Sequence, residues 1–354
     1  RDLFIRTSIF FESQMPMESV PLLRYLLFGR LTRDTILPLE GKPRVDVPGG
    51  SLFYAAAGLA LWGNNCGLVG RVGEDYPQDW LSLFDHHGLD RRGIRVMPEA
   101  VDVRAFYAYL DENTCQRDNP VSHFARLEEP FPKSLLGYAN PTNSRDSRTQ
   151  PGKLSLRMSD IPQDYLDATA AHLCPMDFIS HNLVPPALRN GQINTITLDP
   201  GAGYMNPIFW DDIPALVKGL SAFICSEAKL ANLFLGRSTD PWEMAETVAS
   251  YGCEFVVIKR GARGQYLYDS VNKTGWLVPA YPARIVDPTG AGDAFSGGFL
   301  ATLRETYDPL EAVLRGGVTA SLIMEGTGPF YALDTLPGLP KARLESLRGM
   351  VRRR

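Results

Sequence analysis

The chain has 354 residues, 44% of them hydrophobic, with 36 basic and 40 acidic side chains and a formal net charge of −4. This length allows one large or two modest domains, and the near balance of charge argues against a protein that binds nucleic acid through phosphate contacts. No apolar run reaches the roughly 18 residues of a membrane span, and the five dispersed cysteines indicate reduced thiols and a cytoplasmic location rather than a disulfide framework or a zinc site.

The first predicted elements follow an N-terminal extension over residues 1–21, whose start is too interrupted by charge to be a signal peptide. An apolar run over Leu22–Phe28 predicts a buried strand. Thr35–Leu39 and Arg44–Val47 predict the two strands of a hairpin. Ser51–Trp62 is rich in Ala and Leu and follows a pair of glycines, so it predicts a helix that begins at a glycine turn.

The middle of the chain predicts three strand segments, a helix and a long irregular region. Cys66–Val72 predicts a buried strand and Gln78–His87 a helix. Val101–Leu110 alternates and is rich in aromatic residues, so it predicts a strand that Val121–Leu127 could pair with. Glu128–Asp160 is polar and rich in Pro, Ser and Asn, and is expected to be the least structured part of the chain.

The second half of the chain alternates short β-rich runs with helical segments. Strands are predicted over Phe178–Ser180, Thr195–Leu198, Ala222–Cys225, Phe255–Ile258 and Gln265–Tyr268. This alternation predicts an α/β fold with a doubly wound, mostly parallel sheet. We expect a main domain over residues 22–335, a small β lid built from about 32–48 and 100–127, and a basic C-terminal segment over 336–354 that ends in solvent.

The sharpest chemical signal is the run Asp287-Pro-Thr-Gly-Ala-Gly-Asp-Ala-Phe295. Gly290 and Gly292 allow a tight turn whose backbone N–H groups face one point, and the apolar periodicity that follows predicts a helix beginning there. Converging N–H groups at a helix N-terminus form an anion site, where Asp293 is expected to stay ionised. An ordinary helix start with a capping Asp is the alternative, and it is the more common one for a bare Gly-x-Gly.

The run that ends at Phe295 resembles the second signature of the ribokinase-like (PfkB-type) carbohydrate kinase family: Asp, small residue or Pro, Thr, Gly, Ala, Gly, Asp, any residue, aromatic. Other landmarks of that family follow in its order, namely Leu26–Asp34, Pro48–Ala57, Gly67–Asp75, Gly88–Asp90 and Val256–Gly264. The resemblance spans about residues 22 to 330. It implies a three-layer α/β/α fold with a β lid, and family members often form homodimers through that lid.

The resemblance also implies roles for matching residues. The catalytic set would be Asp293, as the general base, with Gly290, Ala291 and Gly292 as an anion hole. The acceptor would contact Asp34, Gly49 and Gly50. The nucleotide site would comprise Ser226, Lys229, Lys259, Gly261, Gly264, Thr289, Gly326 and Gly328. Asp287 and the Thr289 carbonyl would help bind a monovalent cation such as K⁺, and Mg²⁺ would bridge the phosphates of ATP.

Some assignments come from the residues themselves. Asp34 lies just past a predicted strand end, where open α/β sheets bind ligands, although a plain turn Asp is an equal alternative. Tyr54 could stack on a sugar or a nucleobase, but ordinary packing is more frequent. Arg104, on the aromatic lid strand, could reach an acceptor or a phosphate, and a solvated edge-strand arginine is the alternative.

The chain departs from the family pattern at the turn where an Asn-x-x-Glu element organises Mg²⁺ and phosphate. Here Ser226 and Lys229 replace the Asn and the Glu. Either Lys229 neutralises phosphate directly, or Glu227 substitutes as a metal ligand, or metal use is weakened. Ser51 and Tyr54 also replace the Lys and Asn that ribokinase uses to recognise its sugar, so ribose specificity is not expected.

The sequence therefore predicts an ATP-dependent kinase that phosphorylates a hydroxyl of a sugar or polyol. A nucleoside kinase on the same fold and a catalytically weak, ligand-binding relative are the alternatives. The run Asp199–Tyr204 lacks the Arg of the family's Asp-x-Asn-x-Arg pattern, which argues against an acidic sugar. Walker, dinucleotide-binding, zinc-protease and nucleophile-elbow motifs do not occur.

Overall fold

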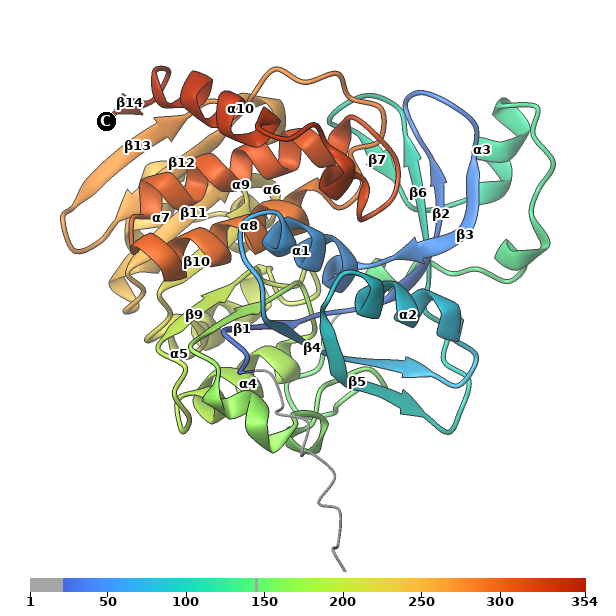
Figure 1. Cartoon of the computed structure of the whole chain (residues 1–354), viewed down its shortest axis with the longest axis horizontal. Coiled ribbons are helices and arrows are strands. Elements are labelled where there is room, and N and C mark those ends of the chain that lie inside the picture. Colours follow the sequence, from blue (N-terminus) through green and yellow to red (C-terminus); the bar gives the residue numbers. More distant parts are fainter. Residues whose placement is uncertain (1–21, 144–145) are drawn as a thin grey trace, which may run out of the picture.

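The computed structural model describes residues 22–143 and 146–354, which fold around two β-sheets (Figure 1). The larger sheet has ten strands in the spatial order β14 (Arg352–Arg353), β13 (Thr274–Val278), β12 (Gln265–Asp269), β11 (Phe255–Lys259), β10 (Ala222–Ser226), β9 (Thr195–Leu198), β8 (Ala170–Leu173), β1 (Tyr25–Phe28), β4 (Cys66–Gly73) and β5 (Asp90–Met97). The strands from β11 to β5 are parallel to their neighbours, whereas β12, β13 and β14 pair antiparallel. The predicted doubly wound, mostly parallel sheet is confirmed.

Helices cover both faces of this sheet because successive strand residues point to opposite sides. Leu26 and Phe28 of β1 belong to one hydrophobic cluster, and Tyr25 and Leu27 to another. The first face is covered by α4 (Phe178–Leu188), α5 (Ile213–Val217), α6 (Glu227–Leu233) and α7 (Pro241–Ser250). The second face is covered by α1 (Ser51–Ala60), α2 (Gln78–His86), α8 (Ala291–Thr306), α9 (Pro309–Met324) and α10 (Leu339–Arg348). The fold is therefore a three-layer α/β/α arrangement.

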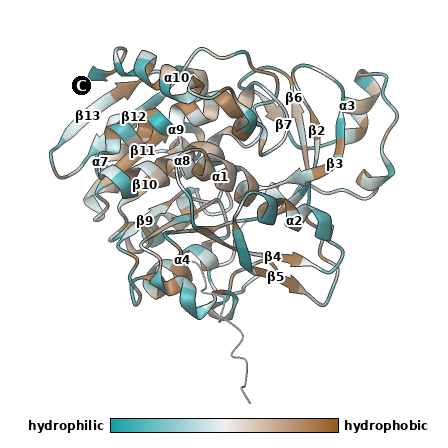
Figure 2. Cartoon of the chain, in the orientation of Figure 1, coloured by the Kyte–Doolittle hydropathy of each residue, from teal (hydrophilic) through white to brown (hydrophobic). Residues whose placement is uncertain are grey.

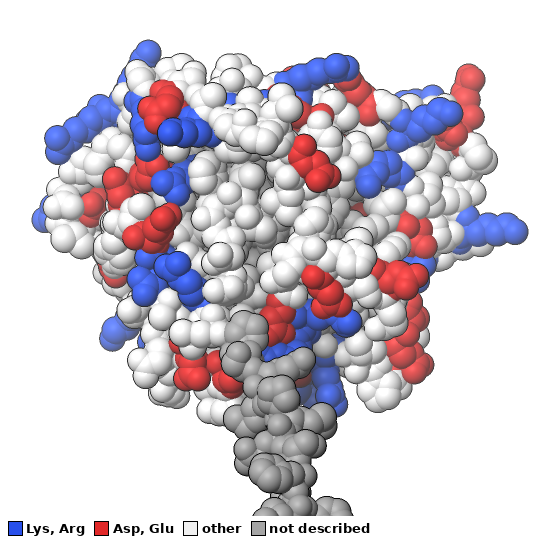
Figure 3. All heavy atoms as spheres, viewed as in Figure 1, with Lys and Arg blue, Asp and Glu red and all other residues white. Residues whose placement is uncertain are grey.

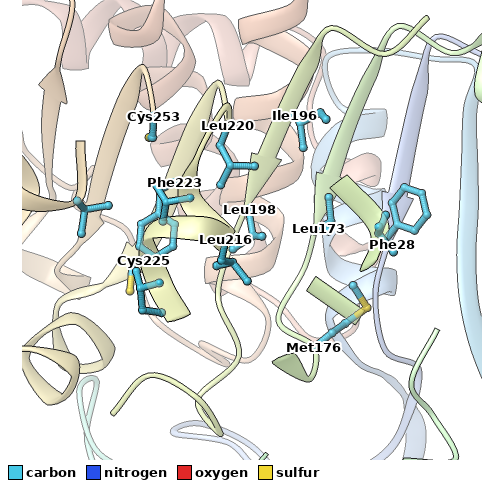
Figure 4. Packing of buried hydrophobic residues seen from close by; sticks show 14 of the residues in the cluster. Phe28, Leu173, Met176, Ile196, Leu198, Leu216, Leu220, Phe223, Cys225 and Cys253 are labelled. Atoms are coloured by element: carbon cyan, nitrogen blue, oxygen red, sulfur yellow. The ribbon is translucent and has the colours of Figure 1, made fainter. Parts of the chain in front are cut away.

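Figure 4 shows part of the first core, where Leu173, Leu198 and Phe223 project from three neighbouring strands. The hydropathy colouring agrees, because hydrophobic residues concentrate on the strands and on the helix sides that contact them (Figure 2). Such apolar burial is the main stabilising contribution to folding. This packing fixes the positions of the strand ends, where Asp199 and Lys259 lie.

The smaller sheet is a lid beside the main sheet (Figure 1). Its strands lie in the order β3 (Arg44–Gly49), β2 (Thr32–Leu37), β6 (Arg104–Tyr109) and β7 (Cys115–Gln116). On its outer face Leu37, Phe106, Phe124 and Leu135 form a separate hydrophobic cluster with α3 (Pro120–Arg126). Side chains alternate between the two faces along β2 and β6. Because Leu37 and Phe106 face outward, Asp34 and Tyr107 lie on the inner face of the lid, toward the main sheet.

Three local predictions were wrong. Val121–Leu127 is not a strand but mostly helix α3, in which Pro120 occupies the first turn and His123 and Phe124 are buried at helical spacing. Phe178–Ser180 is the start of α4, where the Asp177 side chain accepts the Ser180 N–H. Asp34 does not follow a strand end, since it lies inside β2 and pairs with Val47 and Ala105.

The C-terminal segment is part of the main fold. Helix α10 contributes Leu344 and Leu347 to the core beside α9, and β14 adds an edge strand through pairs of Arg352 and Arg353 with β13. Both arginines are exposed, as expected for a solvated end. The predicted extension over residues 1–21 lies outside the described residues.

Charge is interspersed over the face shown in Figure 3, where basic and acidic side chains alternate without a continuous basic patch. Within residues 22–143 and 146–354, none of the helices combines the length and the apolar character needed to cross a bilayer. A dimer through the lid stays a prediction. The outer lid face is already covered by α3 of the same chain.

Candidate active site

The turn before α8 has the geometry of an anion-binding site. Gly290 adopts a left-handed conformation with φ of 74°, and a Cβ there would lie 2.0 Å from the Tyr54 ring, so only glycine fits. The N–H groups of Gly290 and Gly292 find no acceptor among the described residues. Two free donors at the positive end of a long helix favour a negatively charged ligand.

Asp293 follows in the first turn of α8. Its carboxylate is partly exposed and accepts no hydrogen bond from the described part of the chain. Burial raises the pKa of Asp293 to about 6, opposed by the positive charges of Lys259 and Lys229. The expected stabilisation of the ionised form at the helix start is therefore outweighed by burial. A carboxylate with this pKa is suited to act as a general base near neutral pH.

Two lysines and one aspartate form a buried ionic cluster at the ends of β9 to β11. Asp199 is 2% exposed, and its carboxylate accepts from Lys229 Nζ at 2.8 Å and from Lys259 Nζ at 2.6 Å. Burial raises the pKa of Asp199, but these two ammonium groups outweigh it and bring the pKa down to about 2. Lys259 Nζ also donates to the Gly292 carbonyl at 2.9 Å, so the cluster holds a net positive charge directly beside the turn.

Asp34 lies on the inner face of the lid and is fully buried. Its Oδ1 accepts the Thr32 hydroxyl at 2.5 Å, whereas its Oδ2 is buried without a donor. A Cβ on Gly49 would fall 1.9 Å from this oxygen, which explains the glycine. Burial raises the pKa of Asp34 to about 7, partly offset by Thr32 and by Arg117. A buried carboxylate oxygen without a hydrogen-bond donor is suited to accept a hydrogen bond from a ligand hydroxyl.

Two residues predicted to contact the acceptor have structural partners instead. Tyr54 is buried with its ring against Gly290, which is the packing alternative. Arg104 is ion-paired with Asp102 at 2.7 Å and donates to the carbonyl oxygens of Ser134 and Leu136. Its guanidinium thereby ties β6 to the segment after α3.

The two residues predicted to bind metal ions are each paired with arginine side chains. Both carboxylate oxygens of Glu227 face arginines, Arg260 at 3.1 Å and Arg263. Asp287 faces Arg44, and its Oδ1 accepts the Thr289 N–H at 3.0 Å. Among the described residues no group of three or more His, Cys, Asp or Glu side chains could hold a metal ion.

The remaining glycines and Ser226 have local roles. Ser226 caps α6 by accepting the Lys229 N–H. Gly261 has a positive φ, and a Cβ on it would lie 3.2 Å from Asn113 of the lid. Gly264 turns the chain into β12, Gly326 is covered by the Tyr331 ring, and Gly328 lies beside Arg44.

Sequence reasoning missed Arg117 on the lid. The Arg117 guanidinium lies 4.7 Å from the centre of the Tyr107 ring, and its charge lowers the pKa of both Asp34 and Asp293. Alternation of β6 could have indicated that Tyr107 faces inward, but the reach of Arg117 depends on tertiary packing.

Comparison with known proteins agrees with this architecture. The model of the family described as pfkB family carbohydrate kinase matches residues 191–336. The chain is 27% identical over 305 residues to the cytidine kinase of Thermococcus kodakarensis, covering 84% of this chain and 94% of that protein. It is 24% identical over 347 residues to the 5-dehydro-2-deoxygluconokinase of Geobacillus kaustophilus, covering 92% and 94%. The crystal structure of aminoimidazole riboside kinase from Salmonella enterica matches with a TM-score of 0.66 at 18% identity, over 91% of this chain and 99% of that chain.

The three-layer α/β/α arrangement and the β lid together define a ribokinase-like fold. The segment that carries the turn and Asp293, residues 191–336, matches the model of the pfkB family of carbohydrate kinases. The resemblance inferred from the sequence is thus confirmed.

Proposed function

We propose that the protein is an ATP-dependent kinase that phosphorylates a hydroxyl group of a sugar or a nucleoside. The names of its relatives, a cytidine kinase and a 5-dehydro-2-deoxygluconokinase, support this range of acceptors. The observation that carries the proposal is the unpaired Asp293 carboxylate, with a pKa of about 6, one turn from two free backbone N–H donors. A base and an anion cradle at this spacing are what phosphoryl transfer to an alcohol needs.

In the proposed reaction Asp293 accepts the proton of the acceptor hydroxyl as its oxygen attacks the terminal phosphorus of ATP. The bond from that phosphorus to the bridging oxygen breaks, and ADP leaves with the electron pair. The N–H groups of Gly290 and Gly292 donate to the transferring phosphoryl oxygens, and the Lys259 and Lys229 charges stabilise the developing negative charge. Transfer therefore relies on positioning and electrostatics rather than on a covalent intermediate.

Asp34 positions the acceptor in this proposal. Its Oδ2 is buried without a donor, so an acceptor hydroxyl can supply the missing hydrogen bond. On the same lid the Arg117 guanidinium stacks over the Tyr107 ring. An aromatic ring with a stacked guanidinium offers a flat surface, compatible with a sugar ring or a nucleobase.

Glu227, the carboxylate considered as a substitute Mg²⁺ ligand, does not fit that role well, because Arg260 and Arg263 engage it. We propose that Mg²⁺ reaches the site on the phosphates of ATP and keeps most of its water ligands, as this ion commonly does. Of the three alternatives for the missing family glutamate, direct neutralisation of phosphate by Lys229 is the one that these contacts favour.

The test is phosphotransfer from ATP to a panel of sugars, polyols, sugar acids and nucleosides, by wild type and by Asp293→Asn. We expect one acceptor class to be phosphorylated and the variant to lose about 10²–10⁴-fold in kcat, with an unchanged unfolding midpoint. Asp308→Asn, which alters an exposed helix cap far along the same helix pair, is the matched control and should keep wild-type activity. A folded, fully active Asp293→Asn enzyme would falsify the mechanism.

A ligand-binding relative with weak catalysis is the second candidate. The replacement of the family glutamate by Lys229 and the engagement of Glu227 by two arginines motivate it. Stabilisation of the wild type by an acceptor and an ATP analogue, without turnover of ATP with any acceptor, would favour this candidate over the kinase.

A further inference from the structure

Asp287 is a buried carboxylate in the segment that leads into the anion-binding turn. It is 2% exposed, and its Oδ1 accepts the Thr289 N–H. The N–H groups of Val286 and Asp287 both donate to the Met324 carbonyl, at 2.8 and 3.2 Å, which fixes this segment to the end of α9. A buried carboxylate needs a compensating positive charge. The family resemblance assigns that charge to a monovalent cation.

In this chain the positive charge comes from the lid. Arg44, at the start of β3, places Nη1 3.5 Å from Asp287 Oδ2. Both atoms are buried, and neither has a hydrogen-bond partner among the described residues. Arg44 Nη2 lies 3.5 Å from the position of a Cβ on Gly328, so the guanidinium sits between the Asp287 segment and the loop after α9.

A free cation does not fit well beside this guanidinium. Two positive charges beside one buried carboxylate repel each other, and this carboxylate is already neutralised by one guanidinium. A guanidinium offers N–H donors and no oxygen ligand, so it cannot complete the coordination of an alkali ion.

We propose that the Arg44 guanidinium takes the place of a monovalent cation at Asp287, so that the anion-binding turn keeps its shape without K⁺. The lid thereby supplies a fixed charge to the turn. Two further lid contacts support the same junction: the Tyr109 hydroxyl lies 3.0 Å from Thr289 Oγ1, and the Glu40 N–H donates to the Val286 carbonyl. Arg44 is a positioning residue, because it acts through Asp287 and the turn.

The test compares wild type with Arg44→Met at about 0.1 M total salt, supplied as potassium, sodium or tetramethylammonium chloride. Wild type should show the same unfolding midpoint and the same phosphotransfer rate in all three salts. Arg44→Met keeps an apolar stem and removes the charge. In tetramethylammonium its midpoint should fall by several degrees and its kcat by about tenfold or more, and potassium should restore part of both.

Arg284→Met is the matched control. Arg284 pairs with Glu40 across the same junction between lid and turn, but it is exposed. This variant should respond to the three salts as wild type does. Arg44→Lys, which keeps a positive charge, should also be indifferent to the choice of cation and covers the case in which Arg44→Met fails to fold.

Two results would overturn the proposal. One is a wild-type enzyme that potassium activates several-fold, or specifically stabilises, relative to tetramethylammonium. The other is an Arg44→Met protein with wild-type stability and rate in tetramethylammonium. The activity readout rests on the proposed function, whereas the unfolding midpoint does not. If the protein shows no phosphotransfer activity, the kinase proposal is contradicted. The salt dependence of the unfolding midpoint still tests the role of Arg44.

Discussion

The main sheet and the lid each bury an aspartate, and the two carboxylates differ in how far their oxygens are paired with donors. Asp199, at the end of β9, is saturated by two lysine ammonium groups and a low pKa of about 2 keeps it ionised. Asp34, inside lid strand β2, has one oxygen without a donor and a pKa raised to about 7 by burial. A saturated charge stabilises a framework, whereas an unsatisfied one marks a place for a ligand.

This contrast separates two parts of the proposed site. In the proposed site, the sheet side holds fixed positive charge for the phosphates, and the lid side holds one unsatisfied acceptor, Asp34 Oδ2, for the substrate to be phosphorylated. Changes on the sheet side should therefore lower stability first, and changes on the lid side should lower activity first.

The largest expected effect follows from Asp199→Ala. This change leaves Lys229 and Lys259 buried without a counter-charge, and we expect a loss of about 3–5 kcal/mol in the free energy of unfolding, measured by urea denaturation. Asp164→Ala removes an exposed partner of Arg92 and should cost less than about 1 kcal/mol. Equal losses in the two variants would contradict the special status of Asp199.

Asp34→Asn should have the reverse profile. It removes the buried negative charge and its desolvation cost, so the unfolding midpoint should hold or rise. It also weakens the acceptance of a substrate hydroxyl, so kcat/KM for the acceptor should fall by about 10- to 100-fold, the worth of a hydrogen bond to a charged group. A variant that loses stability but keeps its kcat/KM would place Asp34 in the framework instead.

The pH dependence of stability should also distinguish the two aspartates. In an unfolded chain an aspartate has a pKa near about 3.9, whereas folded Asp34 keeps its proton up to about pH 7. Between these values the folded state binds more protons, so raising the pH through this window lowers stability. We expect the unfolding free energy of wild type to fall from pH 5 to pH 8 relative to that of Asp34→Asn. A constant difference between the two proteins would contradict the raised pKa.

The smallest effect is expected from Arg117→Met. Wild-type activity should rise with pH through about 6 as Asp293 loses its proton. Because the Arg117 charge lowers the pKa of Asp293, its removal should move this midpoint to higher pH. The pH–rate profile measures the shift, and Arg126→Met on the nearby helix α3 is the control. A shift to lower pH would show that Arg117 does not act on Asp293 in this way.

The sequence predicted the parts of the fold in which burial and local pattern agree. The apolar runs of β9, β10, β11 and β12 and the glycine turn before α8 were all found within a residue or so. Strand β8 was missed because its sequence, Ala-Ala-His-Leu, is poor in the β-branched and aromatic residues typical of strands. Segment Val121–Leu127 was misread because its apolar residues suit either a strand or a short amphipathic helix.

For the site, the sequence supplied the residues held by one local motif and not those held by packing across the lid. Asp293, Gly290 and Gly292 lie within four residues of one another, so their relation can be read along the chain. The pairing of Arg44 with Asp287 joins residues 243 positions apart by their numbering. The contacts of Arg104 with the carbonyl oxygens of Ser134 and Leu136 likewise depend on packing between segments that are distant in the sequence.

The separate hydrophobic cluster of the lid has a consequence for how substrates enter. Phe106, Phe124 and Leu135 pack among themselves on the outer face, so the lid can swing away from the main sheet without wetting its own apolar interior. Such a movement would break the polar contacts between the lid and the turn, which are those of Arg44, Tyr109 and Glu40. Substrate entry and product release would then need the lid to move as a unit, without unfolding of the lid itself.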